Sequence, residues 1–423
     1  MRVLQVAYSD QGGAAKSCIR LHLGLLKIGV ASRLLVIEQT NREIPESYKF
    51  HPKYVKRDPP LLRDRIKVKV NRILREFGLQ VNRPERSVTH ENRLEGRPDG
   101  FEKFSNPRTE WDITQDENYQ WADIINLHWV AGFIDYPSFF RLNKKPLFWT
   151  LHDMNPFTGG CHYSLGCDGY TRDCKNCPQL YGSTDTNYSR ELLEIKKESI
   201  LDAEIKPVII SPSIWLKKHS KASIAFSQCK HYHILYSLDT EQFKPRDKKL
   251  SREILGIPQS RNVVLFVAES IYNKRKGFDN LKQLIDNNSD PNTLYCSVGK
   301  GSSFLNGDSY MHLGLIHDER LMSMVYSAAD LFLITSKEDN YPNTVIEALC
   351  CGCPILGLNN GGIPEMVDEH SGLILSTEDS LDTALVKLIE NDKFSRAQIS
   401  TRARSKYTLE NQASAYYNLY STC

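Results

Sequence analysis

The sequence predicts an α/β fold with two doubly wound domains, each a parallel sheet covered by helices on both faces. Short runs of β-branched and other apolar residues alternate with stretches of helical periodicity along most of the chain. Strands separated by helices favour parallel sheets. The pattern restarts after a polar, charged segment at 244–249, and a chain of 423 residues exceeds the usual size of one domain. We therefore expect an N-terminal domain over 1–245 and a C-terminal domain over 246–405.

The expected strands are bounded by turn-forming residues. Those of the first domain are Val3–Tyr8, Arg33–Ile37, Asp123–Leu127, Leu147–Leu151, Val208–Ser211 and His233–Tyr236. Those of the second domain are Val263–Val267, Thr293–Val298, Leu331–Thr335, Pro354–Leu358 and Gly372–Leu375. Helical spacing of apolar residues predicts helices such as Ala15–Ile28 and Leu321–Ala329. A last helix over 406–423 is expected to cross back to the N-terminal domain.

Composition and cysteine usage favour a globular cytoplasmic protein. Hydrophobic residues make up 40% and charged residues 25% of the chain, and the net charge is +3. No stretch approaches the roughly 18 consecutive apolar residues that a membrane span needs. The first residues lead directly into a strand, without the apolar core of a secretion signal. Of the eleven cysteines, four cluster in one loop, three lie at a predicted buried helix end and four are isolated, so they do not indicate a disulfide framework.

A basic segment near 53–110 interrupts the alternation of strands and helices. Between Lys53 and Arg86 there are eleven Lys or Arg residues against four acids. Apolar residues recur at helical spacing from Leu62 to Phe77, with basic residues around them. Two interpretations stay open: a helix on an anionic membrane surface, and a surface helix packed on the first domain. The first would place the protein at the inner face of the cytoplasmic membrane, where a lipid-linked acceptor lies.

Three acids surround a helix start in the second domain. Glu338 and Asp339 follow the strand Leu331–Thr335, and a Pro-Asn turn then opens a helix that carries Glu347. Open α/β sheets bind ligands at this edge, and helix N-termini bind phosphate. Carboxylates beside a phosphate site suit a nucleotide sugar, which has hydroxyls next to a diphosphate. Glu347 has a structural explanation as well, because Thr344-x-x-Glu347 has the pattern of a capping box.

Glycines and cations follow the first strand of each domain. Gly12 and Gly13 precede a helix in the first domain, where glycine lets a ligand approach the backbone closely. A tight strand-to-helix turn would need glycine as well. Arg275 and Lys276 lie beyond the first strand of the second domain, where adjacent cations suit a diphosphate. The alternative for these two cations is a solvated charged loop.

Histidines end two strands of the first domain. His128 follows Asp123–Leu127, and His152 and Asp153 follow Leu147–Leu151. A single histidine at a strand end is commonly a hydrogen-bonded structural residue. Two of them at neighbouring strand ends of one sheet indicate a cleft there.

Four cysteines cluster in a loop rich in Gly, Asp and Asn. Cys161, Cys167, Cys174 and Cys177 lie within seventeen positions and include a Cys-x2-Cys pair. This set suits a closed, tetrahedral zinc site that holds an irregular loop together. Because no open coordination position is evident, we expect a structural rather than a catalytic metal ion.

Taken together, these residues resemble the retaining glycosyltransferases of family 4, which have the GT-B fold, in which two Rossmann-like domains face a central cleft. The resemblance is strongest to the bacterial enzymes of capsule, exopolysaccharide and O-antigen synthesis, and it spans nearly the whole chain. Its motifs are QGGAA at 11–15, LHWVAG at 127–132, TLHDMNPFTGGC at 150–161, LDTEQFKP at 238–245, NKRKGF at 273–278 and EDNYPNTVIEA at 338–348.

The resemblance implies roles for individual residues. Asp339 and Glu347 occupy the family's Glu-x7-Glu pair, the first acid facing the donor sugar and the second the nucleotide ribose. Lys276 matches the lysine on the donor phosphates, Gly12 with Gly13 the loop near the diphosphate, and His152 the histidine beside the donor sugar. Backbone amides would complete the donor site at Asn343, Thr344, Gly361 and Gly362.

This sequence departs from the family pattern at two places. The first acid, Asp339, is one methylene shorter than glutamate, and the adjacent Glu338 is expected to compensate. The phosphate-binding arginine is not found before Lys276, where Ala268-Glu269-Ser270 stands, and Arg275 is the expected substitute.

The function that follows is transfer of a hexosyl-type sugar from a nucleotide-sugar donor to a glycan or lipid-linked glycan, in capsule or lipopolysaccharide synthesis. The resemblance implies no obligatory metal cofactor, and His128 and Asp153 are expected on the acceptor side. Two alternatives stay open: a nucleotide-sugar epimerase or sugar phosphorylase, and a non-catalytic GT-B subunit that binds glycan or nucleotide. The sequence offers neither the aromatic stacking positions nor a module for binding nucleic acid.

Overall fold

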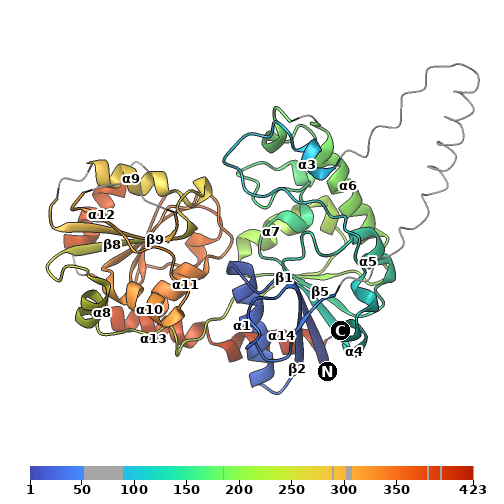
Figure 1. Cartoon of the computed structure of the whole chain (residues 1–423), viewed down its shortest axis with the longest axis horizontal. Helices are drawn as coiled ribbons and strands as arrows, with labels where there is room; N and C mark the ends of the chain where they lie inside the picture. The colour runs from blue at the N-terminus through green and yellow to red at the C-terminus, as the bar shows by residue number, and fades with distance from the viewer. Residues whose placement is uncertain are drawn as a thin grey trace, which may run out of the picture.

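The chain forms two lobes, each built around its own sheet (Figure 1). The structure is a computed structural model that describes residues 1–51, 89–183, 185–287, 290–301, 307–378, 381–390 and 393–422. Within these ranges the strands pair in two sheets, of seven and six strands, and every pairing is parallel. The predicted fold class is therefore confirmed. The basic helix predicted between Leu62 and Phe77 lies outside the described residues.

The first sheet belongs to the N-terminal lobe. Its strand order is β3 (Ser47–Lys49), β2 (Ala31–Glu38), β1 (Arg2–Ser9), β4 (Ile124–Leu127), β5 (Leu147–Thr150), β6 (Val208–Ser211) and β7 (His231–His233). The helices of this lobe are α1 (Gly13–Lys27), α3 (His90–Arg93), α4 (Glu117–Trp121), α5 (Tyr136–Leu142), α6 (Tyr188–Leu201) and α7 (Ile214–Ala222). The strand order reverses between β1 and β4, so a crevice is expected at the carboxyl ends of these strands.

The second sheet repeats this plan. Its strand order is β10 (Tyr310–His312), β9 (Thr293–Lys300), β8 (Asn262–Ser270), β11 (Leu331–Ile334), β12 (Ile355–Leu358) and β13 (Gly372–Leu375). The helices are α8 (Lys248–Leu255), α9 (Phe278–Asn287), α10 (Glu319–Ala328), α11 (Asn343–Cys350), α12 (Leu381–Glu390) and α13 (Arg396–Lys406). Here the order reverses between β8 and β11, which places a second crevice beside the strand that precedes Glu338 and Asp339.

Burial on both faces of the central strands explains their apolar sequences. All four residues of β11 and of β12 are buried. In β8 alternate residues serve different cores, with Val263 and Leu265 on one face and Val264 and Phe266 on the other. A strand covered by helices on both faces is apolar throughout, which is why these strands could be recognised from their sequences.

The last helix, α14 (Leu409–Tyr420), returns to the first lobe and packs against α1. Its Tyr416 hydroxyl lies 2.9 Å from the Thr150 hydroxyl at the end of β5. Gly24 of α1 permits this packing, because a Cβ there would lie 2.7 Å from the carbonyl oxygen of Leu409. Among the described residues, no helix combines the length and apolar character that crossing a bilayer requires.

One predicted strand is misplaced. The sequence predicts a strand at His233–Tyr236, whereas β7 covers His231–His233. The apolar residues beyond it, including Tyr236 and Leu238, are buried in the core of the second domain. These residues are apolar because they are buried in the core of the second domain, where the chain passes from one domain to the other, and not because they belong to the first sheet. The edge strands β3 and β10, each three residues long, were not predicted, since each pairs on one side only.

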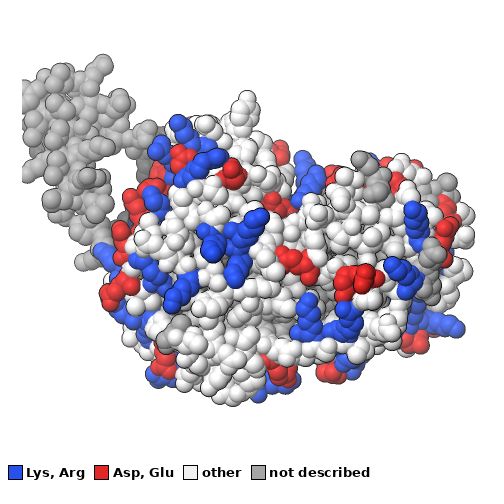
Figure 2. Space-filling model, turned by 180° about the vertical axis from the view of Figure 1, so that it is seen from behind, with Lys and Arg blue, Asp and Glu red and all other residues white. Residues whose placement is uncertain are grey.

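Charged side chains are interspersed over the face shown in Figure 2, and one group of basic side chains stands out on the first domain. Most of this face of both lobes is white, and acidic and basic side chains are scattered over the rest. The net charge of +3 therefore does not arise from a uniformly basic coat on this side of the molecule.

Candidate active site

The carboxyl ends of the two sheets meet across the contact between the lobes. Asn343, the first residue of α11, donates from Nδ2 to the carbonyl oxygen of Gly13 at 3.1 Å. Asn340 donates from Nδ2 to the carbonyl oxygen of His152 at 3.2 Å. The loop after β11 thus touches both segments of the first domain in which the sequence predicts site residues.

Two helix N-termini lie at this contact. Gly12 has a φ of 90° and precedes α1, so a left-handed backbone starts the helix. Pro342, with a φ of −63°, precedes α11, and no side chain caps that helix. The capping box predicted at Thr344 is therefore wrong: the helix begins before Thr344, which lies inside the first turn. The amide of Val345 donates to the carbonyl oxygen of Pro342 at 3.1 Å, whereas those of Asn343 and Thr344, which no side chain caps, are candidates to bind a ligand.

Glu347 is held by a cation from the other domain. Its Oε1 lies 3.4 Å from a guanidinium nitrogen of Arg20 on α1, and its Oε2 accepts a hydrogen bond from Tyr326 at 3.0 Å. Arg20 is itself buried and also contacts Glu319 at 3.1 Å and Asn343 at 3.3 Å. The acid expected to bind the ribose is thus ordered by a residue that the sequence analysis did not single out.

Asp339 is paired with both predicted phosphate-binding cations. Lys276 Nζ lies 2.5 Å from Asp339 Oδ2, and a guanidinium nitrogen of Arg275 lies 3.4 Å from the same oxygen. Burial acts to raise the pKa of Asp339, but the two cations outweigh it and hold the pKa below its usual value. Arg275 also contacts Glu102 at 2.6 Å. The positive charge of the site is therefore balanced by protein carboxylates.

Glu338 contacts the cysteine-rich loop. Its carboxylate accepts hydrogen bonds from the amides of Ser164 at 2.9 Å and Gly166 at 3.3 Å. Burial raises the pKa of Glu338 in spite of these bonds. The expected compensation for the shorter Asp339 is not seen in this arrangement, because the Glu338 carboxylate is engaged with the loop of the other domain.

Gly361 and Gly362 let a loop pack directly on the backbone of the acidic segment. A Cβ at Gly361 would lie 1.9 Å from the carbonyl oxygen of Asp339, and one at Gly362 would lie 1.9 Å from that of Asn340. The amide of Gly362 donates to the carbonyl oxygen of Asp339 at 2.8 Å. This amide is therefore not free for a donor, which corrects its predicted role. The two glycines instead fix the position of Asp339.

His152 belongs to a buried chain of hydrogen bonds. Its Nε2 lies 2.9 Å from His128 Nδ1, and its Nδ1 lies 2.6 Å from the Tyr236 hydroxyl. His128 Nε2 in turn lies 2.8 Å from Gln5 Oε1. If this oxygen accepts from His128, then His152 Nε2 donates to His128 and the tyrosine hydroxyl donates to His152. Burial lowers the pKa of His152 to about 4, so the ring is neutral near pH 7.

Asp153 is fully engaged within the first domain. Its carboxylate accepts from Trp129 Nε1 at 2.7 Å, from the amide of Asn155 at 2.9 Å and from His162 Nδ1 at 2.6 Å. These contacts fix the start of the cysteine-rich loop. The predicted acceptor-side residues His128 and Asp153 line one small pocket of about 10 Å³ together with His152.

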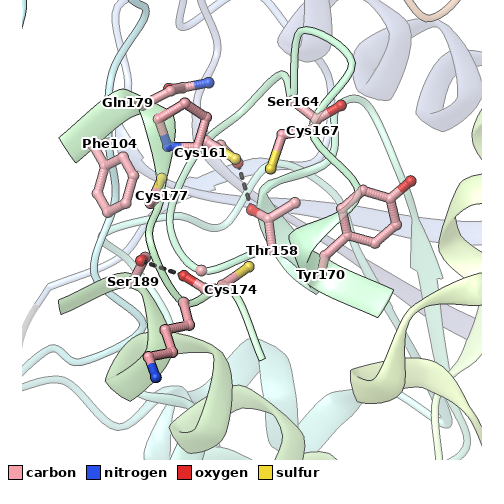
Figure 3. A pocket seen from close by; sticks show the side chains of 13 residues that line it. Phe104, Thr158, Cys161, Ser164, Cys167, Tyr170, Cys174, Cys177, Gln179 and Ser189 are labelled. Atoms are coloured by element: carbon pink, nitrogen blue, oxygen red, sulfur yellow. Dashed lines mark hydrogen bonds between the residues drawn. The ribbon is translucent and has the colours of Figure 1, made fainter. Parts of the chain in front are cut away.

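The four cysteines predicted as zinc ligands line one cavity of about 20 Å³ (Figure 3). In the part of the chain that the structure describes, no three His, Cys, Asp or Glu side chains are arranged to hold a metal ion. The cavity brings the predicted ligands Cys161, Cys167, Cys174 and Cys177 to one place without showing a coordination geometry. Zinc binding therefore stays a prediction.

Three residues of the site were missed. Arg20 lies on the same face of α1 as Gly13 and Ser17, at helical spacing, and that spacing could have indicated it. Tyr163 places its ring 3.8 Å from the Arg275 guanidinium, and its hydroxyl lies 3.5 Å from Asp339. Neither Tyr163 nor Glu102 has a local signal, because both reach the site only through tertiary contacts.

Comparison with known proteins finds similarity to glycosyltransferases. Residues 247–406 match the family model of group 1 glycosyl transferases. The chain is 26% identical over 308 residues to WcaC of Escherichia coli K12, named as a colanic acid biosynthesis glycosyl transferase, which covers 70% of this chain and 73% of WcaC. It is also 25% identical over 201 residues to TuaC of Bacillus subtilis 168, which is named for teichuronic acid biosynthesis. This aligned region covers 46% of this chain and 50% of TuaC.

Solved structures share the fold over the whole chain. The sucrose-phosphate synthase of Thermosynechococcus elongatus has a TM-score of 0.65 at 15% identity and covers 100% of this chain and 99% of its own. WaaG, a glycosyltransferase of lipopolysaccharide biosynthesis, has a TM-score of 0.59 at 13% identity, with 99% of each chain covered. Anabaena HepE in complex with UDP has a TM-score of 0.59 at 15% identity, with 100% of each chain covered. Residues 247–406 therefore match the group 1 glycosyl transferase family, the whole chain has the GT-B fold, and it is similar to bacterial glycosyltransferases named for colanic acid and teichuronic acid biosynthesis.

Proposed function

We propose that this protein transfers a sugar from a nucleotide-sugar donor to a glycan or lipid-linked glycan during synthesis of a bacterial surface polysaccharide. The observation that carries the proposal is the pairing of Lys276 with Asp339, next to the contacts of the same loop with His152 and Gly13 of the first domain. A cation for phosphate and a carboxylate for sugar hydroxyls lie side by side there. A nucleotide sugar has a partner for each, a diphosphate for the cation and hydroxyls for the carboxylate.

In the proposed reaction Lys276 and Arg275 bind the donor diphosphate. Without a donor, both cations are neutralised by Asp339 and Glu102. A diphosphate competes with Asp339 for Lys276, and this frees the carboxylate to accept hydrogen bonds from the donor sugar. The uncapped amides of α11 add donors for the charge that develops on the leaving group as the glycosidic bond breaks. Lys276 and Arg275 thus supply positive charge where the leaving group forms.

Retention at the anomeric carbon, a hexosyl donor and a place at the inner face of the cytoplasmic membrane are parts of the proposal. Retention is supported by the resemblance of Asp339 and Glu347 to the family's pair of acids. The acceptor class is supported by the similarity to WcaC and TuaC, which are named for colanic acid and teichuronic acid biosynthesis. NMR of the purified product tests retention, since the anomeric coupling of the new linkage is compared with that of the donor.

The nucleotide is tested by thermal shift with UDP, GDP, ADP and dTDP. HepE was solved with UDP and with UDP-glucose, so UDP is the first candidate. A nucleotide present at a hundred times its dissociation constant stabilises the fold by about 2.7 kcal/mol. This corresponds to a rise of several degrees in Tm. Selective stabilisation by one nucleotide supports the donor site, whereas no response to any of the four contradicts it.

Incubation of the matching nucleotide sugar with and without acceptor separates the alternatives. A glycosyltransferase releases nucleoside diphosphate in an acceptor-dependent way. An epimerase changes the donor sugar alone, and a non-catalytic subunit binds the nucleotide without turnover. Either of these last two results rejects the proposal.

A further inference from the structure

The cysteine-rich loop folds its four cysteines around one cavity. Cys161, Cys167, Cys174 and Cys177 all line it, and Figure 3 shows their side chains around its wall. The volume of about 20 Å³ has room for one water-sized group. Cys174 has a left-handed φ of 52°, a conformation that costs free energy for a residue with a side chain. The backbone is thus turned sharply where a Cys-x2-Cys pair faces the cavity.

Backbone amides donate to three of the four sulfur atoms. The amide of Gly169 lies 3.4 Å from Cys167 Sγ, two residues before it. The amide of Gln179 donates to the Cys177 sulfur with the same spacing, and the amide of Gly159 donates to that of Cys174. Hydrogen bonds to sulfur are stronger when the sulfur is a thiolate, and such bonds orient the thiolates of metal sites. These bonds orient the sulfur atoms, but burial raises the pKa of Cys161, Cys174 and Cys177, so the thiols would lose their protons only on binding a metal ion.

A buried lysine lies beside the cluster. Lys196 is fully buried, and its ammonium donates to the carbonyl oxygens of Asn155 at 2.5 Å and Thr158 at 3.0 Å. Cys161 and Cys174 lie close enough to interact electrostatically with this ammonium group. Burying a cation is costly unless negative charge is near. Four thiolates around a divalent metal ion carry a net charge of −2, which complements this lysine.

We propose that Cys161, Cys167, Cys174 and Cys177 bind one structural zinc ion. Four thiols release four protons to solvent and form four Zn–S bonds of about 2.3 Å, in the closed tetrahedral arrangement typical of structural zinc. The side chains do not yet show that geometry. The zinc-bound form therefore requires the four thiols to come closer together than they lie in this structure.

The site would hold a part of the cleft in place. Between Cys161 and Cys167 lie Tyr163, which contacts Arg275, and the amides of Ser164 and Gly166, which bind Glu338. A metal ion that fixes both ends of this segment fixes these contacts with the second domain. This consequence rests on the proposed function, whereas the presence of the metal ion does not.

The test measures metal content in the full chain, purified under reducing conditions without chelator. Mass spectrometry for metals is expected to find one zinc ion per chain. Cys174→Ser and Cys177→Ser are expected to lose most of it. Cys229→Ser, at a half-buried cysteine outside the cluster, is expected to keep it. A folded, reduced wild-type protein that contains no zinc and binds none when zinc ion alone is added overturns the proposal.

A second measurement covers variants that do not fold. Wild-type protein is stripped with a chelator under reducing agent and titrated with cobalt ion, which gives intense visible bands in a tetrahedral thiolate site. Saturation at one cobalt ion per chain supports the site. Two disulfides among the four cysteines, found by mass spectrometry of freshly lysed cells under thiol-blocking conditions, overturn it. Neither measurement depends on transferase activity, so failure of this proposal is distinguishable from failure of the proposed function.

Discussion

Lys276 is the residue whose loss should affect transfer most. Its ammonium is half-buried and placed at Asp339, where the proposed diphosphate binds. Removing one preorganised charge at a developing anion typically costs about 10²- to 10³-fold in rate. We expect Lys276→Ala to lower kcat/KM by this amount and Lys276→Arg to recover part of it. Steady-state kinetics with donor and acceptor provide the measurement.

Lys274 is a matched control, because it lies in the same turn but is exposed. Lys274→Ala should keep kcat/KM within about twofold, since a surface charge contributes little. If Lys274→Ala and Lys276→Ala lower kcat/KM equally, Lys276 has no specific role at the phosphate, and the loss reflects a general effect of positive charge.

The neutral histidine pair makes stability depend on pH. Burial lowers the pKa of His152 to about 4 and also lowers the pKa of His128. An unfolded histidine titrates near pH 6.5, so between about pH 6.5 and 4 the unfolded chain binds protons that the folded chain does not. Stability is therefore expected to fall as the pH drops through this window, by up to about 1.4 kcal/mol per pH unit for each histidine.

Urea unfolding at about pH 7.5 and about pH 5 checks this dependence. His152→Gln should show a smaller drop than the wild type. His370→Gln, at an exposed histidine, should show an unchanged one. If the His152→Gln variant and the wild type lose the same stability on acidification, the neutral histidine pair does not cause the effect.

At the scale of elements, Gly24 tests how α14 is held on α1. Replacing glycine by alanine inside a helix ordinarily gains about 1 kcal/mol. Here the added Cβ would lie 2.7 Å from the carbonyl oxygen of Leu409 at the start of α14, so one helix must shift. Overpacking of this kind costs about 1–3 kcal/mol, which outweighs the gain in helix propensity. We expect Gly24→Ala to lower Tm, and a raised Tm would show that α14 does not pack this closely.

The elements that the sequence predicts well are those buried on both faces. Central strands such as β11 and β12 could be located because every residue in them is apolar. The same signal misplaced β7, since Tyr236 is apolar for a different reason, its burial in the other domain. The capping box at Thr344 failed because a proline with a suitable φ starts α11 first. Local patterns identify buried segments but not which core they enter.

At the scale of the whole molecule, the contacts between domains could not be predicted. Arg20 and Glu347 are separated by 327 residues, and Arg275 and Glu102 by 173. Each of these four residues is of a charged type that is ordinarily found on the surface. The sequence indicated that Gly13, Lys276 and Asp339 lie at strand ends, which general rules place at one edge of a sheet. Which cation meets which acid depends on how the two sheets face each other.

Arg20 is the residue through which this arrangement can be tested. It is buried between the domains and contacts Glu319 and Glu347 of the second domain. Removing one partner of a buried ion pair typically costs about 3–5 kcal/mol, because the other charge is left uncompensated.

Since each domain has its own core, we expect Arg20→Met to open the contact between the domains without unfolding either one. The radius of gyration should rise and donor KM should increase by about tenfold or more, which small-angle scattering and kinetics measure. Lys16→Met is the control, because the Lys16 side chain meets the same Glu319 at 3.4 Å but is 41% accessible to solvent, and neither quantity should change. An Arg20 variant with wild-type dimensions and wild-type KM would show that the approach of the two domains does not depend on this ion pair.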